Sequence, residues 1–196
     1  MFKLGLTGSI GMGKSTTAQM FQDEGCAVWD ADAAVHRLYR TGGAAVAPMA
    51  LKFPEVVENN TVSRDKLRQL VGQNPSVLKD IEQIVHPLLG QDRSGFLAKT
   101  TADIVVFDIP LLYETNGDKN MDAVACVFVD DAEQERRVLA RGIMSREQFL
   151  TIKAKQMPAT EKVSRADYVI HTDTLEGAKT DVKKVVDTIR KQLTHA

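Results

Sequence analysis

The sequence G-S-I-G-M-G-K-S at residues 8–15 follows an apolar run, Phe2–Thr7, and precedes a helical pattern that ends near Gly25. This is the spacing G-x-x-x-x-G-K-[ST] of a phosphate-binding loop, in which glycines let backbone N–H groups converge on an anion. The partial positive charge at the start of the following helix favours the same anion. The stretch therefore predicts a strand, a phosphate-binding loop and a helix at the start of an α/β fold that binds a nucleoside triphosphate.

Two side chains of this loop have predicted roles of their own. Lys14 can bridge the β- and γ-phosphates, and the Ser15 hydroxyl can ligate Mg²⁺. The other loop residues expected to surround the nucleotide are Gly8, Ser9, Ile10, Gly11, Met12, Gly13 and Thr16. The alternative, a glycine-rich turn without a ligand, is disfavoured because the pattern rarely arises by chance and here follows the first strand.

The composition is ordinary for a globular protein: 196 residues, of which 43% are hydrophobic and 26% charged. This length fits one α/β domain with a sizeable core. A net charge of −1 disfavours a nucleic-acid binder. Without an apolar run long enough to span a membrane, or a signal-peptide pattern, we expect a cytoplasmic protein. The two cysteines, Cys26 and Cys126, lie too far apart for a metal motif, and we expect buried free thiols.

Short apolar stretches alternate with amphipathic ones along the chain. This alternation predicts βαβ units and a parallel sheet covered on both faces. Five strands are expected, at Phe2–Thr7, Ala27–Trp29, Ile104–Phe107, Ala123–Val129 and Tyr168–Ile170. Apolar residues share one helix face over 75–85 and again over 182–193. We therefore predict one three-layer α/β domain over residues 1–196, with helices on both faces of the sheet.

Two segments depart from this alternation. Residues 33–99 lack a convincing strand, and we predict a helical insertion large enough to cover a substrate. Residues 136–165 hold eight basic and two acidic side chains, a net +6 that leaves −7 for the rest of the chain. A solvated helix face is one explanation of this charge, and a mobile basic flap over a polyanion is the other.

Carboxylates follow two of the expected strands, at the edge where open parallel sheets place their ligands. In Asp30-Ala31-Asp32, Asp32 is expected to meet an acceptor hydroxyl near the γ-phosphate, and the alternative is a helix cap. For Asp30 both interpretations stay open. Asp108 ends a run of four apolar residues, a Walker B pattern whose carboxylate reaches Mg²⁺ or its water shell.

Together these residues resemble the dephospho-coenzyme A kinase family over essentially the whole chain. The similar segments are residues 6–16, D-A-D at 30–32, H-P-L at 86–88, D-I-P-L-L-Y-E at 108–114, Gln156, and A-D-Y-V-I at 166–170. The phosphate-binding loop occurs in many nucleotide-binding proteins, whereas the next three segments, in this order, are specific to this family. The resemblance implies a P-loop kinase fold with an acceptor-binding insertion at 33–99 and a basic lid at 132–160. It also implies ATP-dependent phosphorylation of the ribose 3′-hydroxyl of dephospho-coenzyme A, the last step of coenzyme A synthesis.

The resemblance further implies roles for individual residues. Catalysis would rest on Lys14, Arg141 and Asp32, with Asp32 facing the 3′-hydroxyl. Arg137 and Arg141 fall in the lid, with Arg141 preferred as the phosphate contact and a solvated pair as the alternative. The acceptor would contact Asp32, His86, Leu112, Tyr113 and Glu114. His86 could instead mark a helix kink before Pro87, and Tyr113 and Glu114 could pack and cap. ATP and Mg²⁺ are the implied cofactors, dephospho-coenzyme A is the small-molecule partner, and a monomer is expected.

One departure from the family concerns the adenine end of the site. The family usually has Asn and then Gly after its last strand, whereas this chain has H-T-D-T at 171–174. Thr172 keeps a hydroxyl but lacks the carboxamide. If the residue at this position contacts adenine, the preference for ATP over GTP should be smaller here than in relatives with Asn.

Three other classes of protein remain as rivals. Another small-molecule or nucleoside monophosphate kinase would share the loop and the lid, but not the three specific segments. A regulatory GTPase should carry N-K-x-D after a strand, which does not occur, and the one D-x-x-G, at 92–95, lies in a helical pattern. A nucleic-acid binder using the basic segment is disfavoured by the −7 of the remainder.

Overall fold

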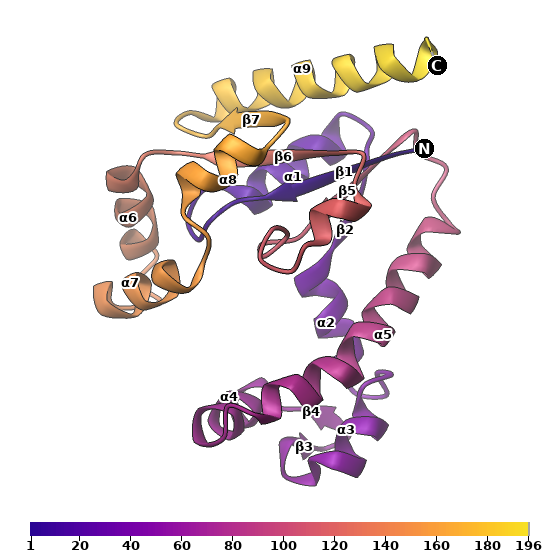
Figure 1. Ribbon diagram of the computed structural model, residues 1–196, viewed down its shortest axis with the longest axis vertical. Helices are drawn as coiled ribbons and strands as arrows, with labels where there is room; N and C mark the ends of the chain where they lie inside the picture. Colours follow the sequence, from indigo (N-terminus) through magenta and orange to yellow (C-terminus); the bar gives the residue numbers. More distant parts are fainter. Residues whose placement is uncertain (196) are drawn as a thin grey trace. The chain divides into compact units, whose positions relative to one another are not determined.

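The computed structural model describes residues 1–195, which form two compact units (Figure 1). The first, called here the sheet unit, comprises residues 1–29 and 101–195. The second, the inserted unit, is Asp30–Thr100. Its limits lie close to those of the insertion expected at 33–99.

The sheet unit is built on five parallel strands in the order β2-β5-β1-β6-β7. Their bounds are β1 (Phe2–Thr7), β2 (Ala27–Asp30), β5 (Ile104–Asp108), β6 (Ala123–Phe128) and β7 (Tyr168–His171). The prediction of five strands is confirmed, each within one residue of its expected end. Because β1 is central, the loop at 8–13 leaves the middle of the sheet. The register pairs Leu6 of β1 with Asp108 of β5, so this carboxylate lies next to the start of the loop.

Helices cover both faces of this sheet, as the sequence predicted. On one face α1 (Lys14–Asp23) and α9 (Leu175–Thr194) share a hydrophobic core with the strands (Figure 1). Phe21 of α1 and Val182 of α9 are both fully buried in it. On the other face α8 (Ala159–Arg165) lies against β6, next to a small cluster of Leu112, Tyr113 and Val124. Both cysteines are buried and unpaired, which confirms that expectation.

Two helices between β6 and α8 form most of residues 132–160, the segment expected to act as a lid. They are α6 (Asp131–Ala140) and α7 (Arg146–Lys155). Asp130 caps α6 by accepting a hydrogen bond from Glu133 N, and Ser145 and Gln148 form a reciprocal capping box on α7. Two exposed ion pairs, Arg146–Glu135 and Lys153–Asp131, join the helices at 2.6 and 2.8 Å.

The inserted unit is mostly helical and has a core of its own. Its elements are α2 (Ala31–Tyr39), α3 (Val46–Lys52), the 3₁₀ turn η1 (Pro54–Val56), β3 (Val57–Glu58), β4 (Thr61–Val62), α4 (Arg64–Gln73) and α5 (Val77–Leu97). Met49 and Val56 are fully buried in its core.

The expectation that this segment lacks strands was wrong in one place. β3 and β4 pair antiparallel around Asn59 and Asn60, whose φ values of 49° and 58° suit a tight hairpin turn. Each strand has two residues, too few to show an alternating pattern in the sequence. Among residues 1–195 no helix combines the length and apolarity that a membrane crossing needs.

Candidate active site

The phosphate-binding loop connects β1 to α1, and its glycines meet specific backbone requirements. Gly11 and Gly13 adopt left-handed φ values of 79° and 88°, which residues with a side chain rarely adopt. Gly13 is the N-cap of α1, so the helix begins at Lys14 with its N-terminal partial positive charge beside the loop. A Cβ on Gly11 would also collide with Val138 of α6. The loop therefore has the curled backbone that its sequence predicted.

Lys14 and Asp108 form an ion pair beside this loop. The pair follows from topology, because Lys14 opens α1 at the end of the loop that leaves β1, and Asp108 ends β5, the neighbour of β1. Asp108 is 2% exposed. A buried carboxylate next to the loop lysine is the arrangement expected of a Walker B residue.

A cavity of about 240 Å³ opens next to the loop. Its wall is formed by the loop, α1, α6, the segment after β7 and the start of α9. The residues that line it are Gly11, Gly13, Thr16, Thr17, Met20, Arg137, Arg141, Thr172, Asp173, Thr174, Leu175 and Ala178. Six of the residues selected from the sequence thus line one cavity, together with the apolar Met20 and Leu175: Gly11, Gly13, Thr16, Arg137, Arg141 and Thr172.

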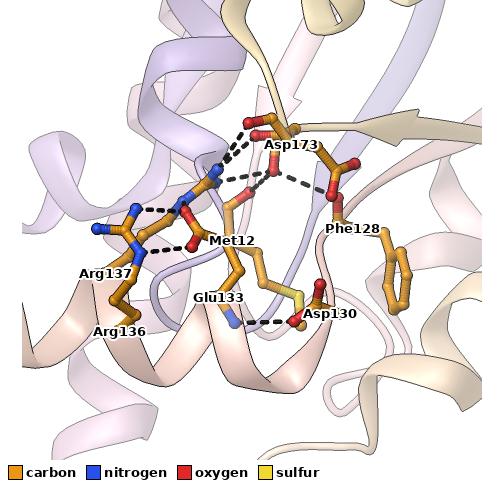
Figure 2. Close-up of polar contacts among 8 residues, drawn as sticks. Met12, Phe128, Asp130, Glu133, Arg136, Arg137 and Asp173 are labelled. Carbon is orange, nitrogen blue, oxygen red and sulfur yellow. Dashed lines mark hydrogen bonds and ion pairs between the residues drawn. The ribbon is translucent and has the colours of Figure 1, made fainter.

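Arg137 is held in the wall of this cavity by several hydrogen bonds (Figure 2). Its guanidinium pairs with Glu133 at 2.6 Å and donates to the carbonyls of Thr172 and Asp173 at 2.7 and 3.3 Å. The Thr172 hydroxyl accepts from Arg137 at 3.3 Å and donates to Met12 O at 2.9 Å. Hydrogen bonds from Arg136 and Arg137 lower the pKa of Glu133 to about 2. Arg137 therefore links α6 to the segment after β7.

Most cations of the basic segment 136–165 are paired within the protein. Six of the eight lie in ion pairs: Arg136, Arg137, Arg146, Lys153, Lys162 and Arg165. Among the residues the structure describes, Arg141 and Lys155 have no carboxylate partner. The excess charge of this segment is thus largely neutralised locally. Of these two, Arg141 is exposed and lines the cavity.

Lys162 of α8 is fully buried, which its place in a basic run did not indicate. Its ammonium pairs with Glu114 at 2.9 Å and donates to Pro110 O at 2.9 Å. Burial raises the pKa of Glu114, but the hydrogen bonds from Lys162 and from Met157 N outweigh this effect and hold that pKa below its usual range. The Lys162–Glu114 ion pair thus connects α8 to the loop that follows Asp108.

The neighbouring residues of this loop are packed as well. Leu112 is fully buried and Tyr113 is 4% exposed. The Arg165 guanidinium lies over the Tyr113 ring, 4.3 Å from its centroid. Of the predicted acceptor contacts, Leu112, Tyr113 and Glu114 thus form part of the interior of the sheet unit in this structure.

Replacing Lys162 with methionine should lower the free energy of unfolding by about 3–5 kcal/mol, because it leaves the Glu114 carboxylate without its buried partner. The double variant Lys162→Met, Glu114→Gln should recover much of this loss. Because the pKa of Glu114 is depressed in the folded state, its contribution is present above the unfolded pKa and is lost as pH falls through the folded pKa. Denaturant unfolding at neutral and acidic pH tests this. Equal losses in the single and double variants at all pH values would contradict it.

Asp30, Asp32 and His86 belong to the inserted unit. Asp30 Oδ1 accepts from Ala33 N at 2.9 Å and caps α2. Asp30 is therefore a helix cap, although α2 begins at Ala31 and not at Ala33, and an acceptor role for Asp30 stays a prediction. Asp32 is exposed in the first turn of α2. His86 is exposed in α5, and the helix continues through Pro87 to Leu97.

Sequence reasoning overlooked two glutamines that contact the loop. Gln134 Nε2 donates to Ile10 O at 2.7 Å, and Ile10 N donates to Gln156 Oε1 at 3.0 Å. Gln156 was noted for its similarity to the family, but no role was predicted for it. Gln134 lies in a polar stretch of α6 with no local signal that it would be fully buried.

A parallel sheet with a phosphate-binding loop after its central strand, and a lysine–aspartate pair beside that loop, defines a P-loop nucleotide-binding protein. Within this class, the chain belongs to the dephospho-CoA kinase family, whose model matches residues 2–176. The dephospho-CoA kinase of Ruegeria pomeroyi is 60% identical over 195 residues, covering 100% of this chain and 99% of that protein. The dephospho-CoA kinase of Cereibacter sphaeroides is 49% identical over 190 residues, covering 97% of this chain and 96% of that protein.

Two solved structures share this fold. TT1252 from Thermus thermophilus superposes with a TM-score of 0.87 at 32% identity, covering 95% of this chain and 96% of that one. Dephospho-CoA kinase from Campylobacter jejuni gives a TM-score of 0.71 at 22% identity, covering 97% and 98%. The latter likeness supports the fold alone.

Proposed function

We propose that this chain transfers the γ-phosphoryl group of ATP to the ribose 3′-hydroxyl of dephospho-coenzyme A, giving coenzyme A and ADP. The observation that carries the proposal is the Lys14–Asp108 pair beside the phosphate-binding loop and its cavity. The family match and the names of relatives that cover almost the whole chain support this acceptor.

On the donor side, we propose that the cavity holds the adenosine of ATP and that the loop holds its phosphates. Phosphoryl transfer depends chiefly on positioning and on neutralising charge. The loop amides and Lys14 would hold the β- and γ-phosphates, and Arg141 would neutralise charge on the transferring group. Thr172 would form part of the pocket wall. The Thr172 hydroxyl donates to Met12 O and not into the cavity, so this bond does not show a contact with the base. A smaller preference for ATP over GTP therefore stays a prediction.

Mg²⁺ is the metal we propose for this reaction. Residues 1–195 contain no group of three or more His, Cys, Asp or Glu side chains that could hold a metal ion. This fits Mg²⁺, which is usually bound by one or two protein oxygens together with substrate phosphates and water. Ser15 and Asp108 would supply these oxygens, and the bound ion would help to neutralise the phosphates.

On the acceptor side, we propose that Asp32 aligns the 3′-hydroxyl and accepts its proton as the transfer proceeds. His86 is proposed as a further acceptor contact from the inserted unit. Leu112, Tyr113 and Glu114 would act by shaping the loop that presents the acceptor. The helices at 132–160 would serve as a lid that excludes water. We further propose a monomer that works in the cytoplasm.

Release of ADP tests this function directly. Mg-ATP is supplied with dephospho-coenzyme A, AMP, adenosine or no acceptor, and fast release is expected only with the first. Turnover with AMP but not with dephospho-coenzyme A would favour a nucleoside monophosphate kinase instead. Titration with adenine and guanine nucleotides distinguishes the kinase from a regulatory GTPase, which would bind the guanine nucleotide more tightly.

Arg141 offers a sharper test of the donor site. Arg141→Ala should lower kcat by about 10- to 100-fold, because a hydrogen bond to a charged group contributes about 1.5–3 kcal/mol. Stability should not change, since the side chain is exposed and has no carboxylate partner in the described chain. Arg136→Ala is the matched control, an exposed lid arginine paired with Glu133 that does not line the cavity. Similar rates for the two variants would remove Arg141 from the proposed mechanism.

A further inference from the structure

The backbone of the phosphate-binding loop is held by side chains from outside the loop. Ile10 is contacted on both sides: Gln134 of α6 donates to its carbonyl, and its N–H donates to Gln156, the C-cap of α7. Thr172 donates to the carbonyl of Met12 at 2.9 Å. The two glutamines come from the beginning and the end of the α6–α7 pair, so both arms of the lid segment reach the same loop residue.

These contacts fix the directions of the loop's free amides. In a planar trans peptide the C=O and the N–H point in opposite directions. A hydrogen bond from Gln134 to Ile10 O therefore turns the next N–H, that of Gly11, away from α6. In the same way, the hydrogen bond from Thr172 to Met12 O sets the direction of the Gly13 N–H. Neither glycine amide donates to an acceptor within residues 1–195, so both remain directed donors.

Gln156 fixes the orientation of the preceding peptide plane, that of Ser9–Ile10. It accepts from Ile10 N, which belongs to the Ser9–Ile10 peptide, and the carbonyl of that peptide accepts from Met12 N at 3.2 Å. Gln134 is fully buried, and its Nε2 bond to the loop is short at 2.7 Å. A buried amide aimed at a single backbone carbonyl restricts that peptide more than a solvated contact would.

We propose that Gln134 and Gln156 are positioning residues for the phosphoryl donor: they orient the two peptide planes of Ile10 and couple both ends of the lid helices to the phosphate-binding loop. The proposal rests on the proposed function, because it assumes that the loop amides bind the phosphates of ATP. It adds that the order of the loop depends on two lid side chains that do not themselves touch the nucleotide.

Gln156→Met and Gln134→Met test this proposal in the full chain. Methionine is close to glutamine in size but can neither accept nor donate a comparable hydrogen bond. Each variant should raise the Kd for Mg-ATP, measured by calorimetric titration without acceptor, by about 3- to 10-fold. The double variant should lose less than the product of the two effects, because both act on one residue. KM for ATP should rise while KM for dephospho-coenzyme A is unchanged.

Gln148→Met is the matched control. Gln148 lies on the same lid but caps α7 by accepting from Ser145 N, without contacting the loop. It should destabilise α7 and leave the Kd for ATP within about 2-fold of the wild type. Gln156→Glu keeps an acceptor oxygen for Ile10 N, so hydrogen exchange at the Ile10 amide should stay slow there and become faster in Gln156→Met.

Two results would overturn the proposal. One is an ATP affinity equal to that of the wild type in Gln156→Met. Because Gln156 is only half-buried, this variant should fold even if Gln134→Met does not. The other is an equal loss of affinity in Gln148→Met, which would reduce the effect to general loosening of the lid. If the wild-type chain itself does not bind ATP, the proposed function fails, and this outcome is distinct from both.

Discussion

Lys14→Ala should weaken ATP binding and lower turnover together. Lys14 lies at the start of α1, where its ammonium can act on the donor phosphates both when ATP binds and when the phosphoryl group is transferred. Loss of one preorganised charge-stabilising group typically costs about 10²–10³-fold in rate. Titration of ATP without acceptor should show the lost affinity, and ADP release with saturating dephospho-coenzyme A should show the lost rate.

A second variant separates this effect from a general loss of positive charge. Lys155 is an exposed cation of α7 without a carboxylate partner in the described chain, and it does not line the cavity. Lys155→Ala should therefore bind ATP and turn over nearly as the wild type does. Circular dichroism and thermal unfolding should show that Lys14→Ala keeps its fold, although the ion pair with the buried Asp108 is lost. Normal affinity and turnover in Lys14→Ala would mean that ATP phosphates are not bound at this loop.

The sheet was predictable because its strands are covered on both faces. A strand buried on both sides is a nearly continuous apolar run, and Ile104–Asp108 shows how such a run ends at the first carboxylate. The β3–β4 hairpin has no comparable signal, since two residues per strand cannot show a period. Its turn is made by Asn59 and Asn60, and two adjacent asparagines suit many kinds of loop.

The phosphate-binding part of the site was predictable for a different reason. Its residues are close together in the sequence, and their spacing reflects a local backbone requirement, as the left-handed Gly11 and Gly13 show. The pairing of Lys14 with Asp108 joins residues that are distant in the sequence. It could be anticipated because strand ends meet at one edge of a parallel sheet.

The rest of the site depends on contacts that no local pattern encodes. Lys162 looked like one more exposed cation of the basic segment 136–165, but its partners Glu114 and Pro110 lie in another part of the chain, and their position makes it an interior residue. Gln134 and Gln156 contact Ile10 across similarly long separations. Net charge summed along residues 136–165 therefore overstated the charge of this segment, because six of its eight cations pair with carboxylates, four of them outside the same helix.

Asp32→Asn should lower kcat for dephospho-coenzyme A by about 10²–10⁴-fold, the usual range for general-base assistance. Asparagine keeps the shape of the side chain but removes its charge and its ability to accept a proton. Asp32 is exposed in the first turn of α2 and is not the residue that caps this helix, so the variant should fold normally. ATP affinity, measured by titration without acceptor, should be unchanged.

Asp30→Asn is the matched control for this prediction, two residues away with the same chemical change. The Asp30 carboxylate accepts from Ala33 N at 2.9 Å, and asparagine caps helices about as well as aspartate does, so turnover and stability should both be preserved. The pair separates a role in chemistry from a role in helix capping. If Asp32→Asn instead loses ATP affinity and keeps a near-normal kcat at saturation, then Asp32 serves the metal or the nucleotide. In that case Asp30 would be the better candidate for the acceptor hydroxyl, and Asp30→Asn should show the loss of turnover.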